Sequence, residues 1–188
     1  MINIINFLKT TPYYLIKPVK DIKCSCCPNC EIMALDFDTV KDQFFEYLKI
    51  DDYKLCSVDG ILFDKHRRAF CIFDMKRYNP LSGLTEIEYV GKELKKMSNK
   101  IVDSIYILSA IMGYYGLDKE HYPILLHPKK LKIFPYMVVN LKSSQEILNV
   151  SLALQKELRI SLSKRIEENI MLINCEQFEY AFSKAAKL

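Results

Sequence analysis

The sequence predicts a single α/β domain in which a small mixed β-sheet is flanked by helices. Half of the 188 residues are hydrophobic, with 12 tyrosines and 10 phenylalanines, which is enough apolar surface for one proper core. Its apolar segments change period along the chain, in the order helix, two strands, helix, strand, helix. No repeat or flexible linker divides the chain. We therefore expect one domain over residues 36–188, preceded by an extension.

The extension, residues 1–35, is predicted to be irregular. Pro12, Pro18 and Pro28 prevent a long helix there, and the stretch CSCCPNC interrupts it. The first helix is expected from Asp38, a suitable N-cap, over DTVKDQFFEYLKI. Its apolar stripe has helical spacing and indicates about three turns; the stripe consists of Val40, Phe44, Tyr47 and Leu48.

Two strands are predicted next, at about residues 54–63 and 69–78. The charged segment DKHRR between them suits an exposed hairpin turn. A helix is expected at 85–114, broken near Met97 to Asn99, with an almost wholly apolar second half that backs the sheet. Residues 131–141 read as another strand, and Pro135 favours an edge position or a bulge. Extra C-terminal helices are expected over SQEILNVSLALQKELR and over 163–186.

Charge and hydropathy narrow the choice of compartment and partner. No window approaches eighteen uncharged apolar residues, and the first residues lack the basic and small-residue signals of a secretory leader. We therefore expect a cytoplasmic protein with no membrane partner. The net charge of +4 permits contact with phosphate backbones without demonstrating it. In such a compartment the seven cysteines should stay reduced.

Three charged residues in the predicted hairpin are unusual for half-buried strands. Asp74 and Lys76 project from the same face of the second strand because side chains alternate. Asp59, on the first strand, should lie level with them across the hairpin. Two converging carboxylates repel unless a hard divalent cation accepts their oxygens, and Mg²⁺ is bound in this way together with substrate phosphate. The pattern predicts metal-assisted hydrolysis of phosphodiesters, unless Asp74 and Lys76 form only a surface ion pair.

The segments VDGILFD and IFDMK together resemble the core of the PD-(D/E)XK nuclease superfamily, especially its RecB-like branch. The resemblance implies a restriction-endonuclease-like core and catalysis with Mg²⁺ or Mn²⁺, covering about residues 38–141. It assigns Asp59 and Asp74 as metal ligands and Lys76 as the residue that acts on the nucleophile. Many members carry a glutamate on the preceding helix, and Glu46 is the matching choice. No Gln-x-x-x-Tyr motif follows the lysine, which departs from the RecB exonucleases.

The following helix carries basic positions that could contact nucleic acid, although a solvated helix face would look the same. They are Lys92, Lys95, Lys96 and Lys100.

The cysteine cluster is a second candidate metal site. Cys27 and Cys30 have the C-x-x-C spacing of zinc ligands, and Cys24 is equally spaced from Cys27. The remaining ligands would be Cys24 or Cys26, or the distant Cys175. Some RecB-like nucleases hold an iron–sulfur cluster with cysteines from both ends of the domain, which draws attention to Cys175. Unliganded, reduced thiols are the alternative.

These observations predict a metal-dependent nuclease acting on nucleic acid, most simply DNA, as an endonuclease or exonuclease. The sequence contains no DNA-reading motif such as a helix-turn-helix, so we expect a protein partner in a larger assembly to supply target recognition. The competing hypothesis is a noncatalytic zinc-binding adaptor or scaffold subunit with an inactive nuclease-like fold. Metal-dependent cleavage distinguishes the two.

Overall fold

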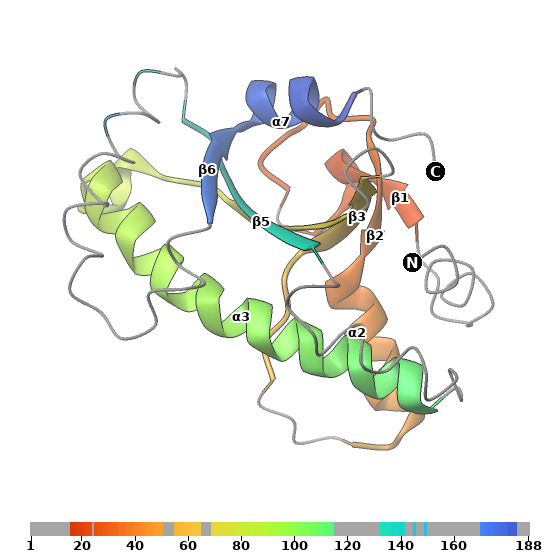
Figure 1. Ribbon diagram of the computed structural model, residues 1–188. Helices are drawn as coiled ribbons and strands as arrows, with labels where there is room; N and C mark the ends of the chain where they lie inside the picture. Colours follow the sequence, from red (N-terminus) through yellow and green to blue (C-terminus); the bar gives the residue numbers. More distant parts are fainter. Residues whose placement is uncertain are drawn as a thin grey trace.

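The computed structural model describes residues 16–23, 25–50, 55–64, 69–114, 132–141, 145, 149 and 170–183. These residues build an α/β fold around a mixed sheet of six strands in the spatial order β1-β2-β3-β4-β5-β6 (Figure 1). The strands are β1 Ile16–Pro18, β2 Met33–Asp36, β3 Gly60–Asp64, β4 Ala69–Lys76, β5 Lys132–Val139 and β6 Met171–Asn174. The first four are antiparallel neighbours, while β5 is parallel to both β4 and β6.

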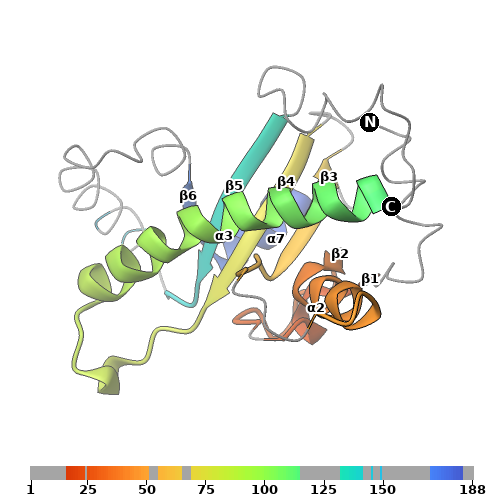
Figure 2. The same cartoon turned by 90° about the horizontal axis from the view of Figure 1, so that it is seen from below.

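Helices cover both faces of this sheet. Helix α3, Glu86–Tyr114, crosses one face, and α7, Cys175–Phe182, lies behind the other (Figure 2). Helix α2, Phe37–Tyr47, leaves β2 and lies on the same side of the sheet as α3 (Figures 1 and 2). Two short 3-10 turns, Val19–Asp21 and Pro80–Ser82, complete the described elements. No helix in the described segments has the length and apolar character needed to span a bilayer.

The sheet therefore separates two apolar cores. Side chains alternate along β4, so Ile72 packs with the α2 and α3 side while Phe73 and Met75 pack with the α7 side. On the α7 side, Phe178 and Phe182 are buried against the strands together with several cysteines. Because the even-numbered positions of β4 face α3, Asp74 and Lys76 also point toward that helix.

The two antiparallel strands and the helices around them are confirmed, with local corrections. The first strand, expected from about residue 54, begins only at Gly60, so Asp59 precedes it. The N-cap of α2 is Asp36 rather than Asp38, since its side chain accepts a hydrogen bond of 3.2 Å from the Thr39 N–H. Helix α3 runs without the break expected near Met97. Pro135 stands in an inner strand, but β6 begins to pair only at Tyr136, so only β4 flanks the proline.

Both ends of the chain hold strands that the sequence did not predict. Residues 16–35 contribute β1 and most of β2 instead of being irregular throughout. The helix expected over 163–186 is wrong at Met171–Asn174, which forms β6 before α7 starts at Cys175. The helix over SQEILNVSLALQKELR falls almost entirely outside the described residues, as does the hairpin turn at 65–68.

Candidate functional site

The backbone before β3 is held by helix α3 in a way that fixes Asp59. The Cys56 N–H donates to Asp103 Oδ2 at 3.0 Å, and the Val58 N–H donates to Ser104 Oγ at the same distance. The carbonyl of Asp59 accepts from the Phe37 N–H at the start of α2, at 3.2 Å. Asp59 is therefore anchored from two helices at the position where the chain enters β3.

Asp59 and Asp74 come together from adjacent strands. The Met75 N–H donates to Asp59 Oδ2 at 2.5 Å, which draws the Asp59 carboxylate over the end of β4. Asp59 is only 7% exposed and Asp74 is fully buried. A single ammonium, Lys100 Nζ, lies 2.7 Å from Asp74 Oδ1 and 3.9 Å from Asp59 Oδ1. The convergence expected from strand alternation is thus present.

Lys76 completes the cluster from the same face of β4 as Asp74. Its Nζ lies 2.8 Å from Asp74 Oδ2 and 3.7 Å from Glu93 Oε2 of helix α3. Glu93 also pairs with Lys96, one turn further along the helix, at 2.6 Å. Three acids and two half-buried lysines, Lys76 and Lys100, therefore alternate in charge across the interface between β4 and α3.

Asp59 is the member of this cluster whose charge changes near neutral pH. Burial and the neighbouring Asp74 carboxylate raise the pKa of Asp59 to about 7, against the opposing effect of Lys100. Burial alone would lower the pKa of Lys76, but Asp74, with Asp59 and Glu93, raises it above the ordinary value. Lys76 is consequently an ammonium ion at neutral pH, whereas Asp59 titrates near neutrality.

Asp38 forms a neighbouring ion-pair group at the start of α2. Burial opposes ionisation of its carboxyl, but hydrogen bonds from Lys41 and Ser57 hold the pKa of Asp38 below its ordinary value, with a further contribution from Lys100. Lys41 Nζ lies 2.8 Å from Asp38 Oδ1. The N-cap residue Asp36 is separately paired with Lys17 at 2.5 Å.

Packing explains the glycine at position 60. It stands directly opposite Phe73 in the β3–β4 pairing, and a Cβ built on Gly60 would meet the Phe73 ring at 2.2 Å. The fully buried Phe73 ring thus covers the glycine. The Asp-Gly pair places a carboxylate on the α3 side while leaving room for an aromatic ring on the α7 side.

Of the remaining predicted site residues that the structure describes, Lys100 contacts the two aspartates. Glu46 is exposed near the end of α2, and none of the described contacts joins its carboxylate to Asp59 or Asp74. Lys92, Lys95 and Lys96 are exposed on α3. Lys100, predicted as a nucleic-acid contact, instead pairs with the two aspartates.

Sequence reasoning missed Glu93 and the role of Lys100. Their spacing of seven residues, two helical turns, puts both on one face of α3, and this was the signal available.

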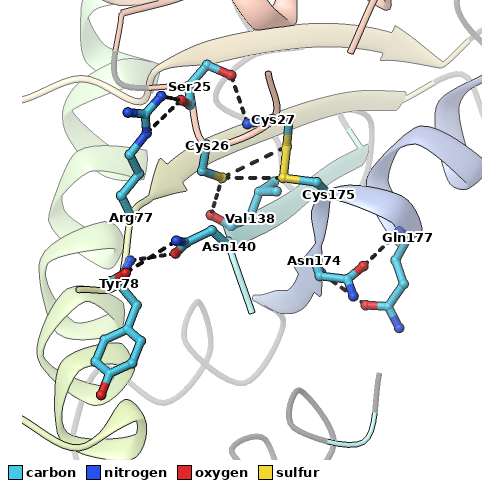
Figure 3. The surroundings of a disulfide bond; sticks show 10 residues. All are labelled: Ser25, Cys26, Cys27, Arg77, Tyr78, Val138, Asn140, Asn174, Cys175 and Gln177. Atoms are coloured by element: carbon cyan, nitrogen blue, oxygen red, sulfur yellow. Dashed lines mark hydrogen bonds between the residues drawn. A yellow bond between two sulfur atoms is a disulfide. The ribbon is translucent and has the colours of Figure 1, made fainter. Parts of the chain in front are cut away.

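Cys26, Cys27 and Cys175 lie together on the opposite face of the sheet, on the α7 side (Figure 3). Cys27 and Cys175, 148 residues apart, form a disulfide with a Cα–Cα distance of 5.3 Å. The free thiol of Cys26 lies 3.9 Å from the Cys27 sulfur and 3.7 Å from the Cys175 sulfur. Burial raises the pKa of the Cys26 thiol to about 11.

This arrangement changes the predicted ligand set. Cys175 does meet the N-terminal cysteines, but the third sulfur within 4.8 Å is that of Cys26, and the buried Cys30 is not part of this group. Cys24 lies outside the described residues. The expectation that all thiols are reduced is wrong for Cys27 and Cys175. Of the other free thiols, Cys71 on β4 is buried and Cys56 is exposed.

Comparison of the chain with family models, curated proteins and solved structures gave no match.

The carboxylates fit a divalent cation by the chemistry of their oxygens. Asp74 Oδ2 is buried and accepts no hydrogen bond of good geometry from any described group, although it lies close to Lys76 Nζ. Burial and the neighbouring Asp74 carboxylate disfavour ionisation of Asp59 and raise its pKa to about 7. An oxygen-preferring cation between the two side chains would relieve both conditions.

Proposed function

We propose that this chain is a metal-dependent nuclease of the PD-(D/E)XK type that hydrolyses phosphodiester bonds in nucleic acid. The observation that carries the proposal is the meeting of Asp59 and Asp74, from neighbouring strands, beside the ammonium of Lys76. Buried carboxylates side by side are costly, and such clusters are concentrated at functional sites.

The fold supports this assignment by its order of elements. The succession α2, β3, β4, α3 and β5, with β4 and β5 parallel, is similar to the helix, three-strand, helix, strand core of the superfamily but has one strand fewer between its two helices. Asp59 directly precedes β3, and Asp74 and Lys76 lie at the end of β4, which supports the roles that the resemblance implies for them.

Each residue has a distinct role in the proposal. Asp59 and Asp74 would hold Mg²⁺ or Mn²⁺, which when bound would supply Lewis-acid activation of a phosphate oxygen and of water. Lys76 has a raised pKa, so it acts as a fixed cation that orients the nucleophile and stabilises negative charge on phosphorus, rather than as a base. Glu93 keeps the Lys76 ammonium in place. Glu46 remains a proposed third acid only through the family resemblance.

The ammonium of Lys100 lies between the two carboxylates, in the position that a bound divalent cation would take. Its Nζ touches Asp74 and approaches Asp59, and its side chain is 22% exposed at the edge of the site. We expect it to move outward on metal binding, toward substrate phosphate, near the exposed Lys92, Lys95 and Lys96 of the same helix. Nucleic acid, most simply DNA, and a protein partner that supplies recognition remain part of the proposal.

The cysteine cluster supports a second, separate possibility. If the disulfide is reduced, Cys26, Cys27 and Cys175 offer three sulfurs within 4.8 Å for Zn²⁺ or an iron–sulfur centre. An adaptor that binds zinc here and has no nuclease activity is the competing function. Elemental analysis of reduced, anaerobically prepared protein tests it.

The decisive experiment measures metal binding and cleavage together. Wild type, Asp74→Asn and the control Glu176→Gln, at an exposed residue of α7 on the other side of the sheet, are titrated with Mn²⁺ and assayed on single-stranded and duplex DNA and RNA with Mg²⁺, Mn²⁺ or chelator. We expect Asp74→Asn to lose both Mn²⁺ binding and cleavage, and Glu176→Gln to keep both. Equal activity in wild type and Asp74→Asn would indicate a contaminant, and absence of Mn²⁺ binding by wild type would reject the nuclease proposal.

A further inference from the structure

The disulfide on the α7 side of the sheet has a third sulfur in contact with it. Cys26 Sγ lies 3.7 Å from Cys175 Sγ and 3.9 Å from Cys27 Sγ, and it donates to the Val138 carbonyl at 3.5 Å (Figure 3). Cys26 and Cys27 are both buried. A reaction among these three sulfurs therefore needs no access for an external thiol.

We propose that Cys26, Cys27 and Cys175 form an internal thiol–disulfide exchange site, in which Cys175 alternates between Cys27 and Cys26 as its partner. Cys26 Sγ is almost equidistant from the two disulfide sulfurs, so its side chain must first turn into line with the Cys27–Cys175 bond. After giving its proton to a base in the solvent, the Cys26 sulfur then attacks Cys175 Sγ. The Cys26–Cys175 bond forms, the Cys27–Cys175 bond breaks, and the electron pair leaves with the Cys27 sulfur, which takes up a proton. The exchange is an isomerisation that consumes no oxidant or reductant.

Covalent geometry selects which sulfur is attacked. Attack on Cys27 would join two adjacent residues, whose Cα atoms are about 3.8 Å apart across a trans peptide. That separation is below the usual range of about 4.4–6.8 Å for disulfides. Attack on Cys175, which is also the nearer sulfur, joins residues that are distant in sequence. Exchange therefore keeps α7 covalently linked to the N-terminal loop, but through Cys26 instead of Cys27.

The exchange changes more than the bond itself. The Cys27 N–H donates to Ser25 Oγ at 3.2 Å, and the Ser25 carbonyl accepts two hydrogen bonds from the Arg77 guanidinium, at 3.0 and 2.6 Å. Arg77 follows Lys76 directly at the end of β4. Transfer of the cross-link from Cys27 to Cys26 therefore shifts the loop whose Ser25 carbonyl is hydrogen-bonded to Arg77. The exchange among the three sulfurs does not depend on whether the cluster around Asp59 and Asp74 is catalytic.

The test maps the cross-links in the full-length chain. Protein is incubated with a glutathione redox buffer, quenched in acid, alkylated and digested without reduction. Mass spectrometry then identifies the partner of Cys175, and fragmentation tells which of the adjacent Cys26 and Cys27 is alkylated. Wild type should contain both isomers. Cys27→Ser should shift the cross-link to Cys26–Cys175, Cys26→Ser should lose that isomer and keep Cys27–Cys175, and the buried control Cys30→Ser should match wild type.

The wild-type measurement keeps the test valid if a variant fails to fold. Absence of the Cys26–Cys175 isomer from wild type after prolonged incubation would overturn the proposal. So would a Cys27→Ser protein that melts like Cys30→Ser but leaves Cys175 free, or joins it to Cys24 or Cys30. One equivalent of zinc held by the three sulfurs, with no disulfide in oxidising buffer, would also overturn it in favour of a metal site.

Discussion

Lys100 Nζ, on the helix that crosses the sheet, lies 2.7 Å from Oδ1 of the fully buried Asp74 on β4. The same ammonium is 3.9 Å from Asp59 Oδ1, so one side chain supplies positive charge to both acids. Without that charge the carboxylates would repel each other in a poorly solvated environment. A bound divalent cation and Lys100 should therefore compete for the same two oxygens.

Replacing Lys100 with methionine tests this competition. We expect Lys100→Met to bind Mn²⁺ more tightly, by about tenfold, because the metal no longer displaces an ammonium ion. In the absence of metal the variant should be less stable, by about 1–3 kcal/mol, because Asp74 loses a charged partner. Titration calorimetry measures the affinity and urea unfolding the stability. Lys96→Met, at a lysine of the same helix that pairs with Glu93, is the matched control and should change neither.

Asp59 should make stability depend on pH in an unusual direction. Its pKa of about 7 in the folded protein exceeds the value of about 3.9 for an unfolded chain, so folding takes up a proton between these pH values. The contribution of Asp59 to stability is therefore fully present below pH 4 and is lost as pH rises to about 7. Asp59→Asn should be more stable than wild type at pH 8, by about 2–4 kcal/mol, and not at pH 4. Urea unfolding in metal-free buffer across this range measures it, and a constant difference would contradict the assignment.

Lys76→Ala should separate binding from catalysis. If the Lys76 ammonium stabilises charge on the reacting phosphate, kcat should fall by about 100-fold or more while affinity for nucleic acid stays within about threefold. Single-turnover cleavage and fluorescence anisotropy measure the two quantities. Lys92→Ala, on the exposed face of α3, should show the opposite pattern, with weaker binding and nearly unchanged cleavage at saturation. A Lys76→Ala protein that cleaves at the wild-type rate would remove Lys76 from the mechanism.

Gly60→Ala should disturb the site through packing. The added methyl would meet the fully buried Phe73 ring, and overpacking of this kind costs about 1–3 kcal/mol. The shift would also move Asp59, the preceding residue, so Mn²⁺ affinity should fall as well. Combining Gly60→Ala with Phe73→Leu should restore part of both losses. Thermal unfolding and Mn²⁺ titration of the single and double variants form a double-mutant cycle.

Reduction of the disulfide should loosen the contact between the two ends of the fold. Cys27–Cys175 closes a loop of 148 residues, and breaking such a cross-link costs about 2–5 kcal/mol. We expect wild type treated with dithiothreitol to unfold at lower urea concentration than untreated protein. A Cys27→Ser, Cys175→Ser double variant should show no difference with dithiothreitol. Equal stability of oxidised and reduced wild type would mean that the cross-link contributes little.

The local sequence pattern was sufficient to predict the central strand and helix of the fold. Alternation in AFCIFDMK put Asp74 and Lys76 on one face, and the apolar period of EIEYVGKELKKMSNKIVDSIYIL predicted the helix that covers them. The strand MLIN was missed because three apolar residues and an asparagine before a helix are too short to show a period of their own. Only pairing with β5 makes them a strand.

The helix–hairpin–helix–strand order and the shared face of Asp74 and Lys76 can be derived from the sequence alone, because both follow from the periods of helices and strands. The partners of those residues depend instead on how the elements pack together. Lys100 reaches Asp59 and Asp74 only because α3 packs across β3 and β4, and its charge could equally have faced solvent. Cys175 meets Cys27 only because β6 and α7 return to the N-terminal loop. Contacts between residues distant in the chain depend on how elements pack, and no local period encodes that packing.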